Sequence, residues 1–127
     1  MEEHLATLAK LDAAEPSPAE VAAVLEAART YLLEVGWTQD TTGAPGAPRC
    51  LVGAVSEQAA NYAVEHHSAI GFSMCVYPME ALRRALGLRR PEHLPRWNDH
   101  PERTLGDVVD LLETTAKRVR AGEIDYT

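Results

Sequence analysis

Two helix-start signals, one near each end of the chain, constrain its fold more than any other feature. Residues 17–20 read Ser-Pro-Ala-Glu, with serine at an N-cap position, proline first in the helix and glutamate third, and residues 104–107 read Thr-Leu-Gly-Asp. In such capping boxes the hydroxyl accepts a hydrogen bond from the first helical turn, and the acidic side chain accepts one from the cap residue. The sequence therefore predicts a helix behind each signal.

An apolar stripe follows each capping box. Over residues 18–35 apolar side chains recur at intervals of three and four, up to a stop at Gly36, and residues 105–121 repeat the pattern up to Gly122. This is the period of a helix with one buried face, and glycine is the usual residue just beyond a helix end. Both helices must therefore pack against other elements.

Two further helices are predicted between these. Residues 50–66 have helical spacing with many alanines and a glycine, so another helix can approach them closely. Pro78 suits the first position of a helix over residues 78–87, which ends at Gly87. A short extended piece is an alternative for residues 72–77, just before that proline.

The remaining segments lack a regular pattern. Residues 38–49 and 88–103 contain several prolines, with glycines in the first, and are predicted to be long irregular connections. Leucines at three-residue spacing make residues 1–15 a short helix or a loosely docked arm, and residues 123–127 form a tail.

Composition supports the same fold class. The chain has 127 residues, which suits one domain, and its 46% hydrophobic share comes mostly from alanine and leucine, with only 6% aromatic residues. The β-branched and aromatic runs that mark strands are nearly absent. We therefore expect a mostly α, single domain of four to five helices with long irregular loops and little or no strand.

Charge and hydropathy limit the kinds of partner and the compartment that we expect for this protein. The formal net charge of −7 makes nucleic acid an unlikely partner, although six arginines lie between residues 83 and 103. No apolar run reaches the length of a membrane span, and the acidic residues 1–4 lack the apolar region of a signal peptide. We expect a cytoplasmic protein in which Cys50 and Cys75 are reduced thiols, with a disulfide between them as the alternative.

The segment before the last helix is the first candidate site. Trp97, Asn98 and Asp99 stand together there, and Trp37 and Gln39 follow the first capped helix. Aromatic and amide side chains of this kind can line a small-molecule pocket, to which Arg96 could add a positive charge. The structural alternative is that Trp97 anchors the segment in the core while Asn98 or Asp99 caps backbone groups and Arg103 pairs with Asp99 or Glu102.

Cys50 is the second candidate. It stands where a helix begins, and a helix N-terminus stabilises a thiolate. A thiol-dependent enzyme would use Cys50 as nucleophile, the Gln39 amide at the oxyanion, His100 among the possible bases and Asp99 to orient the base. The alternative is that Cys50 is a small buried core residue.

Neither a metal nor a cofactor is expected. His66, His67, His93 and His100 could bind a metal with Asp99, but no His-x-x-x-His or Cys-x-x-Cys spacing is present. Adjacent histidines on a helix point about 100° apart and rarely share an ion.

The order of the short motifs resembles a family of small actinobacterial and phage proteins known only as a domain of unknown function. The motifs are Gly-Trp-Thr-Gln at 36–39, Cys-Leu-Val-Gly-Ala at 50–54, Trp-Asn-Asp at 97–99 and Arg-Thr at 103–104. The resemblance spans residues 18–121 and implies a mostly helical fold. It implies no activity.

These observations favour a small soluble accessory domain that binds a small molecule or a protein partner through the Trp37/Gln39 and Trp97–Asp99 loops. The alternative is a thiol-dependent enzyme of acyl-transfer or hydrolase type. The binding hypothesis requires the two tryptophan-containing loops to meet in the fold.

Overall fold

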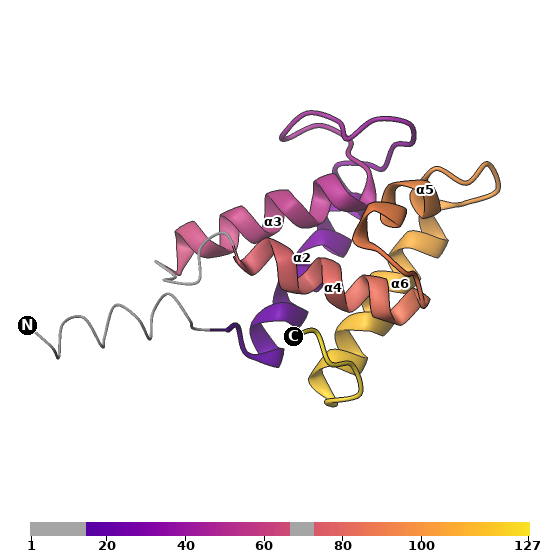
Figure 1. Ribbon diagram of the computed structural model, residues 1–127. Helices are drawn as coiled ribbons and strands as arrows, with labels where there is room; N and C mark the ends of the chain where they lie inside the picture. The colour runs from indigo at the N-terminus through magenta and orange to yellow at the C-terminus, as the bar shows by residue number, and fades with distance from the viewer. Residues whose placement is uncertain (1–14, 67–72) are drawn as a thin grey trace, which may run out of the picture.

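A computed structural model describes residues 15–66 and 73–127 of the chain. Its elements are α2 (Pro18–Glu34), α3 (Leu51–Glu65), α4 (Ser73–Leu86), the 3-10 turn η1 (Pro91–His93), α5 (Leu94–Asn98) and α6 (Leu105–Arg120) (Figure 1). The only β pairing among the described residues is one isolated bridge. The prediction of a mostly α domain with four to five helices is confirmed. The predicted N-terminal arm lies outside the described residues except for Glu15.

Both capping boxes form as predicted. The Ser17 hydroxyl accepts from the Glu20 amide at 3.2 Å, and the Glu20 carboxylate accepts from the Ser17 amide at 3.0 Å. Thr104 and Asp107 make the same reciprocal pair at the start of α6, with distances of 3.2 and 3.0 Å. These bonds satisfy backbone donors that a helix leaves free at its N-terminus.

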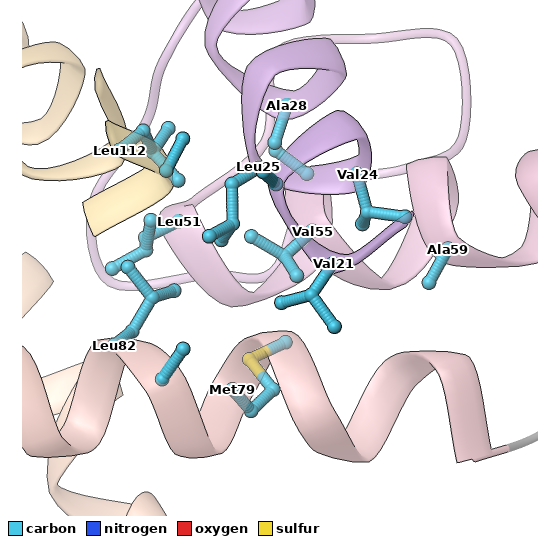
Figure 2. Packing of buried hydrophobic residues seen from close by; sticks show 14 of the residues in the cluster. Val21, Val24, Leu25, Ala28, Leu51, Val55, Ala59, Met79, Leu82 and Leu112 are labelled. Carbon is cyan, nitrogen blue, oxygen red and sulfur yellow. The ribbon is translucent and has the colours of Figure 1, made fainter. Parts of the chain in front are cut away.

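The core lies where the four long helices face one another. α2 packs along α6 and against α3, while α4 lies below α3 in this view and contacts α2, α3 and α6 (Figure 1). Leu25, Leu51, Leu82 and Leu112, one from each of these helices, converge with no exposed surface (Figure 2). Burying one leucine side chain stabilises a fold by roughly 1.5–3 kcal/mol. The apolar stripes seen in the sequence therefore meet in one common core.

Helix α4 begins earlier than predicted. It starts at Ser73, so Pro78 lies inside the helix, and the extended alternative for the preceding residues is wrong over residues 73–77. A proline inside a helix removes one backbone hydrogen bond. Met74 lies before the proline, is fully buried in the core, and continues the face that carries Met79 and Leu82. Packing of this face offsets the lost bond.

The segment over residues 88–103 is more regular than predicted. Pro91 and Pro95 each occupy an early position of a short helical element, η1 and α5, where the missing N–H costs no hydrogen bond. Prolines that were interpreted as helix breakers therefore act here as helix starters. The short α5 ends at Asn98, which it brings to the buried side of the segment.

The C-terminal residues are anchored in the core. Ile124 and Tyr126 are buried, and the Tyr126 hydroxyl donates to the Pro16 carbonyl oxygen at 2.7 Å. The ring of Tyr126 also meets Tyr77 of α4 edge to face, with ring centroids 5.9 Å apart. The tail thus ties the start of α2 to α4.

Candidate functional site

The two ends of the loop between α2 and α3 are hydrogen-bonded to each other. The Arg49 amide donates to the Gly36 carbonyl at 3.2 Å, and the Thr38 amide donates to the Arg49 carbonyl at 3.1 Å. These bonds form the isolated parallel bridge between Trp37 and Arg49. The long irregular connection predicted for residues 38–49 is confirmed, and it is a closed loop whose two ends lie side by side.

Side chains of α2 and α3 hold this loop in position. Glu57 of α3 forms a salt bridge with Arg49 at 3.1 Å and accepts from the Gly46 amide at 3.2 Å. The Tyr31 hydroxyl of α2 donates to the Ala47 carbonyl, and burial raises the pKa of that hydroxyl. Gly43 has a φ of +79°, and a Cβ there would lie 2.1 Å from the Pro48 carbonyl oxygen. The loop is irregular but closely packed.

Asn98 joins this loop to α5. It has no exposed surface, and its Oδ1 accepts from the Trp37 indole N–H at 2.7 Å and from the Leu51 amide at 3.0 Å. Its Nδ2 donates to the Thr38 carbonyl at 3.1 Å and to Asp99 Oδ1 at 2.9 Å. All four hydrogen-bonding positions of the amide are therefore occupied.

Two more side chains complete the junction. Gln39 Nε2 donates to the carbonyls of Asn98 and His100, at 3.0 and 2.9 Å. Asp99 Oδ1 accepts from the amide of Asp40 at 2.9 Å, and Asp40 has a positive φ of 65°. The two tryptophan-containing loops, about 60 residues apart in the chain, therefore meet.

A pocket of about 200 Å³ lies beside this junction, at the N-terminus of α3. Charged, hydroxyl, thiol and apolar groups line it: Asp40, Thr41, Thr42, Cys50, Val52, Pro95 and Asp99. Cys50 is the most buried of these residues, whereas the two threonines are exposed. The pocket thus combines an apolar wall with two carboxylates and two hydroxyls.

The structure places the predicted binding residues in two different positions, the pocket and the junction beside it. Asp99 lines the pocket, whereas Trp37, Gln39 and Asn98 form the junction that supports it. The pocket-lining Asp40, Thr41, Thr42, Val52 and Pro95 were not among the predicted site residues. The unusual length of the threonine-bearing loop was the one signal in the sequence that pointed toward some of them.

Arg96 and Trp97 lie beside the junction but do not line the pocket. Arg96 is exposed, and Trp97 is half-buried against the core. The predicted pairing of Arg103 with Asp99 or Glu102 is wrong. Its guanidinium lies 3.9 Å from the ring centroid of Trp97, and its Nε donates to the Trp97 carbonyl at 2.8 Å. A cation over an indole face gains electrostatic attraction, so this pair fixes the end of α5.

Cys50 is the N-cap residue of α3, and only 6% of it is exposed. Its Sγ accepts from the Gly53 amide at 3.4 Å, which is the capping bond of the helix. His100 Nδ1 accepts from the Glu102 amide at 3.1 Å, and no imidazole of the described residues is hydrogen-bonded to the thiol. Cys50 and Asp99 therefore share the pocket, but the structure does not bring His100 to Cys50 as a base.

The other chemical groups of the sequence are separate from this site. Cys50 and Cys75 are both free thiols. In the part of the chain that the structure describes, no three His, Cys, Asp or Glu side chains are placed to hold a metal ion. Arg83 and Arg84 both bind Glu80, and the hydrogen bond from Arg83 lowers the pKa of that carboxyl.

A protein-family model described as a family of unknown function, DUF6197, matches residues 16–118. The chain belongs to the DUF6197 family. The match runs from the start of α2 into the last turns of α6, so it includes both loops, Asn98 and every residue that lines the pocket. The resemblance inferred from the ordered motifs is confirmed at the level of a family of unknown function.

Comparisons of this DUF6197 chain with curated proteins and with solved structures return no match. None of the helices over residues 15–66 and 73–127 has the length and apolarity needed to cross a membrane.

Proposed function

We propose that this DUF6197 domain is a binding domain whose ligand, a small molecule or a side chain of a protein partner, occupies the inter-loop pocket. One observation carries the proposal. Two loops distant in the chain are joined by hydrogen bonds of the buried Asn98 side chain. Beside this junction lies a pocket, and most of the hydroxyl and carboxylate groups that line it are not used by the junction. Preformed concave sites with a few convergent polar groups are typical of ligand binding.

The size of the pocket limits the ligand. A pocket of about 200 Å³ is smaller than the roughly 300–1,000 Å³ that accommodates drug-sized ligands and cofactors. A nucleotide or a flavin is therefore too large, whereas a small metabolite or the end of one side chain fits. Binding of this kind needs no nucleophile, and the capping bond on the Cys50 thiol favours it over thiol catalysis.

A fragment screen on the full chain tests the proposal. Two-dimensional ¹H–¹⁵N NMR spectra recorded with fragment mixtures should reveal compounds that shift the amide signals of Thr41, Thr42 and Val52. A Val52→Phe variant should block these shifts, because Val52 lines the pocket.

Val64→Phe is the matched control. Val64 stands on the same helix but is 74% exposed and lies outside the pocket, so this variant should retain the shifts. The proposal is wrong if no fragment perturbs the pocket amides, or if Val52→Phe folds normally and leaves the shifts unchanged.

A further inference from the structure

We infer that the inter-loop pocket takes an organic cation, a primary ammonium or guanidinium group on a short alkyl stem. The inference rests on the proposed function and names the chemical class of the ligand. Asp40 and Asp99 both line the pocket. Among the described residues no salt bridge or hydrogen bond involves the Asp40 carboxylate, and Asp99 uses only its Oδ1. Two carboxylates therefore line the pocket without a counter-charge.

No basic side chain of the described residues lines the pocket. Arg96 follows Pro95 in the sequence, but it is exposed and lies outside the lining. Arg49 precedes Cys50, but its guanidinium binds Glu57 at 3.1 Å and donates to the Thr42 carbonyl at 3.3 Å. Arg103 lies against Trp97. The partial positive charge at the N-terminus of α3 stabilises the carboxylates but amounts to only about half a unit charge. The pocket as a whole therefore attracts a cation.

The remaining lining residues select an organic cation. No group of three or more metal-ligating side chains is formed among the described residues, so the two carboxylates lack the further protein ligands of a metal centre. Val52, Pro95 and the buried Cys50 give the pocket an apolar wall. An alkyl stem would pack on that wall while its charged end meets the carboxylates, as lysine and arginine side chains do elsewhere.

Binding of four probes of similar size tests this inference on the full chain. The probes are n-butylguanidinium, n-butylammonium, n-butanol and butyrate, each titrated while the amide signals of Thr41, Thr42 and Val52 are followed by NMR. Both cations should bind. Butanol should bind about fivefold more weakly than the cations, because it lacks the charge. Butyrate should not bind, and calcium chloride should not shift these signals.

An Asp40→Asn variant tests the charge without changing the backbone. Asparagine tolerates the left-handed conformation that Asp40 adopts, at a φ of 65°, nearly as well as aspartate does. The variant should weaken binding of both cations about two- to fivefold. Asp110→Asn is the matched control, because Asp110 is an exposed carboxylate on α6 and the variant has the same net charge. Its affinity for the cations should equal that of the wild type.

Three outcomes would overturn the inference, and the first two of them would leave the proposed function intact. Butanol could bind as tightly as butylammonium, or Asp40→Asn and Asp110→Asn could weaken cation binding equally, and in either case the pocket would bind without selecting charge. If calcium shifted the same amide signals, the ligand of the pocket would be a metal ion and not an organic cation. If fragments bind elsewhere and no probe reaches the pocket, both the inference and the proposed function fail.

The cationic group in the pocket could belong to a free amine or to a side chain of a protein partner. A blocked Gly-Lys-Gly peptide and a blocked Gly-Arg-Gly peptide distinguish them from the free butyl cations. Tighter binding of the peptides assigns the pocket to a partner's lysine or arginine. Tighter binding of the free cations assigns it to a small-molecule amine.

Discussion

Replacing Asn98 with alanine should strongly destabilise the domain. The Asn98→Ala variant removes both ends of an amide that is fully buried and makes four side-chain hydrogen bonds. The Trp37 indole N–H, the Leu51 amide and the Thr38 carbonyl lose their partner. A buried polar group left without a partner costs about 1–3 kcal/mol, but the cost is smaller for the partners on Trp37 and Thr38, because these two residues are only half-buried. We therefore expect a loss of about 3–5 kcal/mol in the free energy of unfolding.

Urea denaturation followed by circular dichroism measures this loss. Asn61→Ala is the matched control, because Asn61 is exposed on α3 and its replacement should change the free energy of unfolding by less than about 0.5 kcal/mol. If Asn98→Ala were as stable as this control, the hydrogen-bonded junction could not be what holds the two loops together.

An Asn98→Asp variant distinguishes the contribution of the acceptor oxygen of the amide from that of its donor nitrogen. It keeps an oxygen that can accept from Trp37 and from the start of α3, but at neutral pH it loses the donor to Thr38 and adds a charge beside Asp99. We expect destabilisation at pH 7 that lessens as the pH falls toward about 4, because protonation removes the repulsion and restores a donor. A pH-independent loss would contradict this assignment of donor and acceptor.

Three further predictions concern the loop, the thiols and the surface charges. Gly43→Ala should lower the free energy of unfolding in urea by about 1–3 kcal/mol more than Gly46→Ala, because both glycines have positive φ but only the first would bring a Cβ against a backbone carbonyl. Equal losses would refute close packing of the loop. Iodoacetamide should label Cys75 before Cys50 in the native protein, as judged by peptide mass spectrometry, since Cys75 is partly exposed and Cys50 is 6% exposed. Faster labelling of Cys50 would revive the thiol-enzyme hypothesis. Glu80 has a pKa below its ordinary value, so its ion pairs stabilise the fold above the unfolded-state pKa and this contribution is lost as the pH falls through the folded-state pKa. Between about pH 5 and pH 3, wild type should therefore lose more stability in urea than Glu80→Gln, and equal losses would contradict the shift.

The sequence predicts the helices well where local signals and burial agree. The boxes at Ser17 and Thr104 set two helix starts correctly, because each capping interaction lies within four residues of the chain. Pro78 misleads for the opposite reason. Its local preference for a helix start is outweighed by Met74, whose burial depends on elements distant in the sequence. Pro91 and Pro95 start short helices, and no regular spacing of apolar residues predicts these helices.

The candidate site is only partly predictable for a similar reason. Polar and aromatic residues in the two loops marked the region, and Asn98 and Gln39 do connect them. The role of Asn98 differs from the prediction because a buried amide with every position occupied cannot also bind a ligand. The Nε2 of Gln39 is likewise used within the protein, on the carbonyls of Asn98 and His100. Asp40, Thr41 and Thr42 line the pocket only because the loop closes at Arg49, a contact that no pattern in the sequence announces.

The packing of α2 along α6 also bears on how the chain folds as it is made. A ribosome releases the first of these helices about 70 residues before the second begins, a delay of roughly 4–14 s at ordinary elongation rates. Throughout that time the apolar stripe of α2 lacks its main partner, and Tyr126 has not yet reached Pro16. The nascent domain therefore cannot close its core during most of its own synthesis. The fold is completed only after α6 and Tyr126 have been synthesised, and among these helices α2 is the one to which a chaperone would have the longest access.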